Sequence, residues 1–205
     1  MIKSTINGIF PTPIYMSKLD RELTNKELSF IDKTKLDVYK NEGNTTSNDN
    51  YILNNKTFKN LKEDLDLRVK DYFEKVISPT DSITPYITQS WLNYTEKNQY
   101  HHKHVHPNSL VSGVFYINCD KEHDKIKFFN DKFQTIKPEI KDWNIWNSET
   151  WWFSVKTGDI ILFPSSLFHM VENKKGANTR ISLAFNVFVK GSIGSNKNLE
   201  ELILK

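Results

Sequence analysis

The sequence predicts a mainly β protein with flanking helices, in which a jelly-roll or sandwich core packs on N-terminal helices. From Ile83 onward, short β-branched and aromatic stretches are separated by Gly, Pro, Asn and Asp, a pattern typical of antiparallel strands. Leucine and isoleucine recur at helical intervals only before that point. We therefore expect one domain over all 205 residues. Within this domain we expect an N-terminal strand and supporting helices over residues 1–82, a jelly-roll core over 83–190 and a C-terminal tail over 191–205.

The N-terminal part begins with the sequence FPTPIY at residues 10–15. Its two prolines force extended backbone and predict an edge strand or a strap across the domain. Residues 20–37 predict a helix with Thr24 as N-cap, and its apolar residues are Leu23, Leu28, Ile31 and Leu36. Residues 41–55 are polar and predict a surface loop.

The strongest helix is predicted over residues 57–77 and ends at Ser78-Pro79. One apolar stripe runs along it, formed by Phe58, Leu61, Leu65, Tyr72, Phe73 and Val76. Such a stripe predicts a helix that faces the core.

Six strand-like stretches follow. They are ITPYITQSWLNY (83–94), SLVSGVFYINC (109–119), KIKFFN (125–130), WWFSVK (151–156), DIILFP (159–164) and TRISLAFNVFVK (179–190). The segment 132–150 is long and irregular, with Trp143 and Trp146 among polar residues, and predicts either a lid or a strap anchored by these tryptophans. After Gly191 we expect a flexible link and a short amphipathic turn.

Composition excludes several classes of protein. The net charge of +3 comes from mixed charges without a basic run, which gives no case for nucleic acid. A single cysteine, Cys119, excludes an internal disulfide framework and a cysteine-rich zinc site, and we expect a buried structural thiol there. No signal-peptide core or long apolar run is present, so we expect a soluble, cytoplasmic protein with no membrane partner.

Four of the six histidines lie within residues 101–106. Imidazole is the commonest protein ligand for transition metals. In a strand, alternate residues share a face, which places His102, His104 and His106 together. The pattern predicts a metal site, and the alternative is a solvated, histidine-rich strand edge.

Two later stretches complete this candidate site. His169 follows the apolar strand of residues 159–164, and a jelly roll brings such distant strands together. Arg180 and Ser182 share one face of the last long strand, where the guanidinium suits a carboxylate. The alternatives are a core histidine, and an arginine paired with an acidic residue of the protein itself.

These residues resemble the Fe(II)/2-oxoglutarate-dependent oxygenases. The similarity rests on HVHPNSLVSGVFY (104–116), GDIILFPSSLFHMV (158–171) and RISLAFN (180–186). In this order and spacing they are most similar to a branch related to prolyl 4-hydroxylases. The resemblance implies a double-stranded β-helix, which is a jelly roll.

The resemblance assigns roles to individual residues. His104, His106 and His169 match the positions of the iron ligands, and Arg180, assisted by Ser182 and Tyr116, matches the site for the distal carboxylate of 2-oxoglutarate. His106 stands where most of the superfamily has aspartate. A neutral face of three histidines can still hold Fe(II), but Zn(II) and Ni(II) become harder to exclude, and His102 could compete as a ligand.

The implied function is a dioxygenase that uses Fe(II), 2-oxoglutarate and dioxygen to hydroxylate a C–H bond of an unknown substrate. A peptidyl substrate follows only by analogy with the relatives. One rival is a cupin-like metalloenzyme that does not use 2-oxoglutarate. The other is a non-enzymatic jelly-roll module with a stabilising metal.

Overall fold

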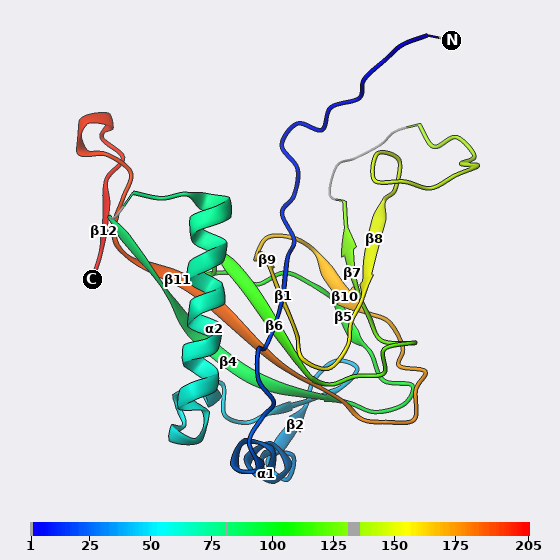
Figure 1. Ribbon diagram of the computed structural model, residues 1–205, viewed down its shortest axis with the longest axis vertical. Helices are drawn as coiled ribbons and strands as arrows, with labels where there is room; N and C mark the ends of the chain where they lie inside the picture. The colour runs from blue at the N-terminus through cyan, green and yellow to red at the C-terminus, as the bar shows by residue number, and fades with distance from the viewer. Residues whose placement is uncertain (1, 81, 131–135) are drawn as a thin grey trace.

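Two antiparallel β-sheets form the body of the protein (Figure 1), whose computed structural model describes residues 2–80, 82–130 and 136–205. The larger sheet has the order β1 (Tyr15–Lys18), β9 (Asp159–Pro164), β6 (Val111–Asn118), β11 (Arg180–Ile193), β4 (Ile83–Thr95), β3 (Thr45–Ser47) and β2 (Val38–Lys40), and β12 (Leu202–Leu204) pairs with β11. The smaller sheet has the order β5 (His101–His104), β10 (His169–Val171), β7 (Lys125–Phe129) and β8 (Thr150–Ser154).

The predicted fold class is confirmed. The chain passes repeatedly between the sheets, so that β4 and β6 lie in one and β5 and β7 in the other. All strand pairs are antiparallel, and the result is a jelly roll with helices against its larger sheet. No helix in the described parts of the chain is long and apolar enough to cross a membrane.

The helix α2 (Lys59–Tyr72) covers the outer face of the larger sheet (Figure 1). Leu61, Leu65 and Val69 recur at three- and four-residue spacing, are buried, and share one core cluster with side chains of the sheet. A 3₁₀ turn precedes the helix and a π-helical turn extends it to Ile77. The predicted helix over 57–77 and its end before Pro79 are therefore confirmed, although Val76 is partly exposed.

The helix α1 (Asn25–Thr34) begins at the predicted cap. The Thr24 side chain accepts a hydrogen bond from the Glu27 amide, and the Glu27 carboxylate accepts one from the Thr24 amide. Ile31 is buried as expected, but Leu28 and Leu36 are exposed. The predicted stripe is wrong at both residues: Leu36 lies beyond the end of the helix at Thr34, and Leu28 lies on an exposed face of the helix.

The prediction of a surface loop over 41–55 is wrong. This segment contains β3 and a 3₁₀ turn (Ile52–Asn54), and it has buried residues. Its polar side chains are buried because they are hydrogen-bonded: Thr46 Oγ1 donates to Asn93 Oδ1, and Ser47 Oγ accepts from the Leu92 amide. A strand made of threonine and serine carries no apolar signal, so its pairing with β4 could not be seen.

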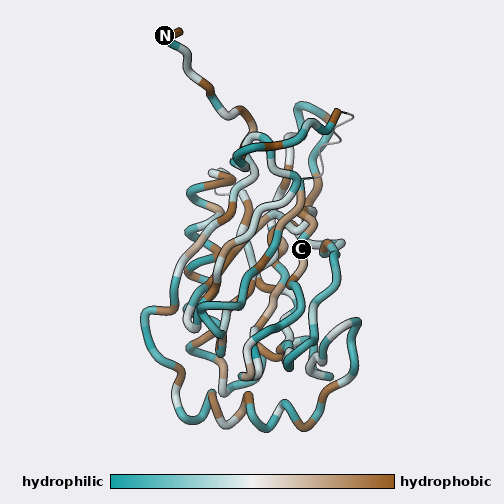
Figure 2. Tube along the Cα trace, turned by 90° about the vertical axis from the view of Figure 1, so that its right-hand side faces the viewer, coloured by the Kyte–Doolittle hydropathy of each residue, from teal (hydrophilic) through white to brown (hydrophobic). Residues whose placement is uncertain are grey.

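The two ends of the chain differ from each other. The N-terminal segment extends away from the body, and β1 then joins the edge of the larger sheet (Figures 1 and 2). An edge strand is therefore present, but it overlaps the predicted segment 10–15 only at Tyr15. The prediction of a flexible C-terminal link is wrong, because β11 continues to Ile193 and β12 pairs back onto it. Ile193 and Leu204 pack against the core cluster, which explains the order of this hairpin.

The segment 132–150 begins in residues 131–135, which lie outside the described residues. Trp143 and Trp146 are both more than half exposed, so they do not anchor the segment in the core as the strap interpretation required. Closure of this segment over the site stays a prediction.

Candidate active site

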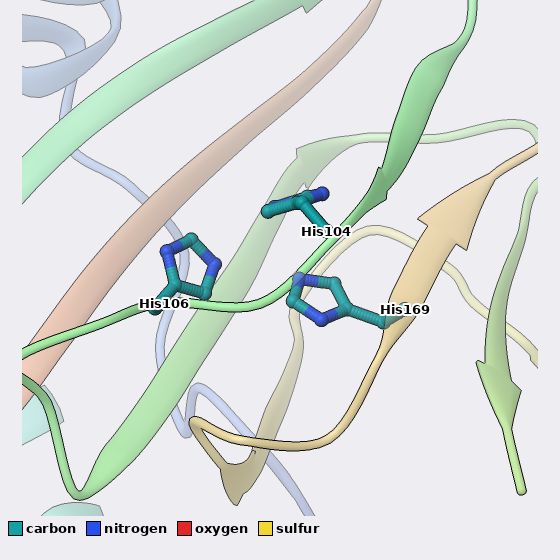
Figure 3. Close-up of side chains that lie close together, drawn as sticks. All are labelled: His104, His106 and His169. Carbon is teal, nitrogen blue, oxygen red and sulfur yellow. The ribbon is translucent and has the colours of Figure 1, made fainter. Parts of the chain in front are cut away.

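Three histidines meet between the two strands β5 and β10 (Figure 3). His104 ends β5 and lies opposite His169, the first residue of β10, while His106 follows two residues after His104. The ring centroids are 4.2 Å apart for His104 and His169, 4.9 Å for His104 and His106, and 5.2 Å for His106 and His169. One nitrogen from each ring lies within 4.8 Å of the others, which fits a metal ion bound by three imidazoles.

Backbone carbonyls fix two of these rings. Nδ1 of His104 lies 2.8 Å from the His102 carbonyl oxygen, and Nδ1 of His169 lies 3.0 Å from that of Leu167. A carbonyl oxygen only accepts, so each Nδ1 carries the proton and donates it. Nε2 of both rings is then left with a free lone pair for a metal, as in known metal-ligating histidines.

Burial keeps the cluster uncharged. Burial, followed by the neighbouring His104, lowers the pKa of His169 to about 3 and that of His106 to about 4. The pKa of His104 is lowered by the same desolvation. The three rings are neutral at pH 7, which is the form that binds a metal.

The prediction that His102 shares a face with His104 and His106 is wrong, because β5 contains a β-bulge. Opposite β10, His169 pairs with His104 and Val171 with His101, so three steps of β5 oppose two of β10. His101, rather than His102, therefore lines the cavity, and its ring stacks on His104 at 4.5 Å. Strict alternation missed this residue because a bulge leaves no mark in the sequence.

The larger sheet supplies the opposite wall of the cavity. Residues paired across an antiparallel sheet share a face. One row across the sheet consists of Tyr116, Ser182, Asn93 and Thr46, and the next begins with Arg180 and Thr95. All but Thr46 line the cavity that holds His104, His106 and His169. The predicted shared face of Arg180 and Ser182 is confirmed, and Tyr116 lies beside them.

Arg180 also has a protein partner, as the alternative interpretation proposed. Its guanidinium lies 3.3 Å from the carboxylate of Asp124, and the Lys174 ammonium lies 3.7 Å from the same carboxylate. The three side chains are at most 4% exposed. Two buried cations thus share the carboxylate of Asp124. Sequence analysis missed Asp124 and Lys174, which lie in polar loops without a distinguishing pattern.

Two further groups are held in neutral form. Burial raises the pKa of the Tyr116 hydroxyl, so it is protonated and can donate a hydrogen bond. Burial likewise raises the pKa of the Cys119 thiol, which packs partly buried against a smaller core cluster. This agrees with the expected structural thiol.

The fold is a jelly roll, and its cavity is lined by three histidines suited to a metal ion and by the buried arginine Arg180. Residues 89–186 match the family model described as "Putative 2OG-Fe(II) oxygenase". That region contains the three histidines together with Tyr116 and Arg180. This part of the chain is therefore similar to the 2OG-Fe(II) oxygenase family, which supports an enzyme of that class.

Solved structures agree in fold. A 2OG-Fe(II) oxygenase-family oxidoreductase from Burkholderia pseudomallei is 15% identical, with 85% of this chain and 83% of that chain covered and a TM-score of 0.56. HygX from Streptomyces hygroscopicus, with nickel, 2-oxoglutarate and hygromycin B bound, is 12% identical (86% and 82% covered, TM-score 0.56). A prolyl hydroxylase from Trichoplax adhaerens, in complex with a hypoxia inducible factor peptide fragment, is 10% identical (85% and 83%, TM-score 0.59). No curated protein matches the sequence.

Proposed function

We propose that the protein is a dioxygenase that couples the oxidative decarboxylation of 2-oxoglutarate to the hydroxylation of a substrate C–H bond. The observation that carries this proposal is a single cavity lined both by the three histidines and by Arg180, Ser182 and Tyr116. A bound metal and a bound dicarboxylate would therefore share this cavity.

Each set of residues has a proposed role. His104, His106 and His169 would hold Fe(II), because their donor set fits and their rings are neutral. Arg180 would bind the distal carboxylate of 2-oxoglutarate, with hydrogen bonds from the Ser182 and Tyr116 hydroxyls. Asp124 holds the Arg180 guanidinium in the wall of the cavity and is a positioning residue.

When bound, the metal and 2-oxoglutarate would supply the oxidation chemistry. One dioxygen molecule is consumed: one oxygen atom enters succinate as 2-oxoglutarate loses carbon dioxide, and the other enters the new hydroxyl group of the substrate. The described side chains contribute binding, orientation and a buried environment. The reaction needs no separate acid–base pair.

With histidine at position 106, the three protein ligands would bring no formal charge to the metal ion. An aspartate at this position would bring one negative charge, whereas three neutral imidazoles bring none. The neighbouring His101 is also kept neutral, since burial and then His104 lower its pKa to about 2. We infer that the charge needed to balance Fe(II) comes from 2-oxoglutarate itself, so that metal and co-substrate bind cooperatively.

The chain is further proposed to act as one oxygenase domain. The main core cluster contains side chains of α2 together with side chains of β4, β6, β9 and β11. The helical support and the jelly roll thus share one hydrophobic core.

Radioactive 2-oxoglutarate labelled at C1 tests this function. The native protein with Fe(II) and oxygen should release labelled carbon dioxide, slowly without substrate. His169→Ala and Arg180→Ala should each lower that release at least tenfold. Asn60→Ala, a change at an exposed position on α2, should leave it unchanged. Tight zinc binding without any 2-oxoglutarate turnover would instead support the structural module, and oxidation independent of 2-oxoglutarate would support the cupin-like enzyme.

A further inference from the structure

Asn44 lies in the tight turn between β2 and β3, beside the histidine strand. The Asn41 amide donates to the Asn44 carbonyl at 2.9 Å and closes the turn. Gly43 has φ +90°, and the Tyr100 amide donates to its carbonyl at 3.0 Å. A Cβ atom at Gly43 would lie 2.7 Å from the Tyr100 carbonyl oxygen, so only glycine permits this close approach. The turn is therefore fixed against the residue that precedes β5.

The sheet register turns Asn44 toward the cavity. Thr45 pairs with Tyr94, and Arg180 pairs with Thr95. Continued by one residue, the antiparallel register places Asn44 opposite Thr95, in the same row as Arg180. Neighbouring strands are about 4.8 Å apart, so Asn44 lies about 10 Å from Arg180 across the sheet. Both side chains line the cavity.

The side chain of Asn44 is 3% exposed, and neither its nitrogen nor its oxygen has a hydrogen-bond partner among the described residues. Its neighbour in the adjacent row differs, because Asn93 accepts a hydrogen bond from Thr46. Buried amides without partners are rare in native proteins because their desolvation is not compensated. A donor and an acceptor without partners therefore lie side by side, buried in the wall of the cavity.

We propose that Asn44 binds an amide group of the substrate, either a peptide bond or a side-chain carboxamide. This inference rests on the proposed function and adds the chemical class of the substrate. An amide offers one N–H donor and one C=O acceptor, which satisfies both unpaired atoms of Asn44 at once. A carboxylate only accepts and an ammonium only donates, so each would leave one atom of Asn44 unpaired. The 2-oxoglutarate carboxylate belongs at Arg180, across the sheet.

NMR of the side-chain amide of Asn44 tests this proposal. The sample is the full chain loaded with diamagnetic zinc and 2-oxoglutarate, and the Asn44 signals are assigned by their loss in Asn44→Asp. The probes are N-acetyl tripeptide amides with every amino acid in the central position. Matched depsipeptides, in which an ester oxygen replaces the central N–H, remove the donor. Some peptides should move the Asn44 signals, and their depsipeptides should bind more weakly.

Variants separate this inference from the proposed function. Asn44→Leu should weaken peptide binding about tenfold, the size expected for two lost hydrogen bonds. Asn60→Leu, at an exposed position on α2, should not. Both should bind 2-oxoglutarate like the native protein. The inference is wrong if no peptide moves the Asn44 signals, if Asn44→Leu binds peptide normally, or if it loses 2-oxoglutarate instead. Failure of the native protein to bind 2-oxoglutarate would overturn the proposed function itself.

Discussion

Asp124 balances the charge behind the proposed co-substrate site. Its buried carboxylate is shared by Arg180 and Lys174. Replacement by asparagine would leave two buried cations without a counter-charge, which is among the most destabilising changes known for ion pairs. We expect Asp124→Asn to lower the free energy of unfolding by about 3–5 kcal/mol, measured by urea denaturation.

A second variant identifies the cause of that loss. Lys174→Met removes one cation and leaves the Arg180–Asp124 pair balanced, so it should cost clearly less than Asp124→Asn. A loss in Asp124→Asn no larger than that of the exposed Asp142→Asn would show that the carboxylate does not balance these charges.

Some residues of the candidate site can be predicted from the sequence and others cannot. His104, His106, His169 and Arg180 could be placed because strand alternation and motif spacing mark them. Asn44 could not, because it reaches the cavity only through the register of β3 on β4, and that strand consists of threonine and serine. Asp124 and Lys174 likewise become partners only in the folded chain.

Among the secondary-structure elements, α2 carries the packing on the larger sheet. Leu65 is 0% exposed and Leu67 is 61% exposed, two residues apart on the same helix. Leu65→Ala would leave a cavity in the core and should lower the free energy of unfolding by about 2–5 kcal/mol. Leu67→Ala should change it by less than about 0.5 kcal/mol. Equal losses in the two variants, measured by thermal and urea denaturation, would contradict the described orientation of α2.

The sequence predicts the long apolar strands better than the short or polar ones. The strands β4, β6, β9 and β11 are strongly apolar and β-branched, and all were predicted. The short strand β3, the bulge in β5 and the terminal strand β12 were missed. Each depends on pairing with a distant strand rather than on its own composition.

For the molecule as a whole, the buried histidines predict a specific response to acid. The folded-state pKa values of His106 and His169 are about 4 and about 3, below the ordinary value of 6.5. The unfolded chain therefore binds protons first, and stability falls as the pH drops from 6.5 toward these values. Each histidine contributes at most about 1.4 kcal/mol per pH unit.

Urea denaturation of the metal-free protein between pH 7 and pH 5 measures this effect, because most carboxylates titrate at lower pH. His101→Phe, which removes one buried imidazole with a lowered pKa, should make the decline shallower. A stability that stays constant over this range would show that the histidines are not desolvated as described.

We propose that one cavity holds Fe(II) on three histidines and 2-oxoglutarate on Arg180. Anaerobic titration of the metal-free protein with Fe(II) and 2-oxoglutarate tests it through the visible absorption band of the iron–keto acid complex. We expect the band in the native protein and in His106→Asp, which restores a carboxylate ligand. His169→Ala should abolish it, and Arg180→Ala should shift its midpoint to at least tenfold higher 2-oxoglutarate. No band in the native protein, or a band that survives unchanged in His169→Ala, would contradict the claim.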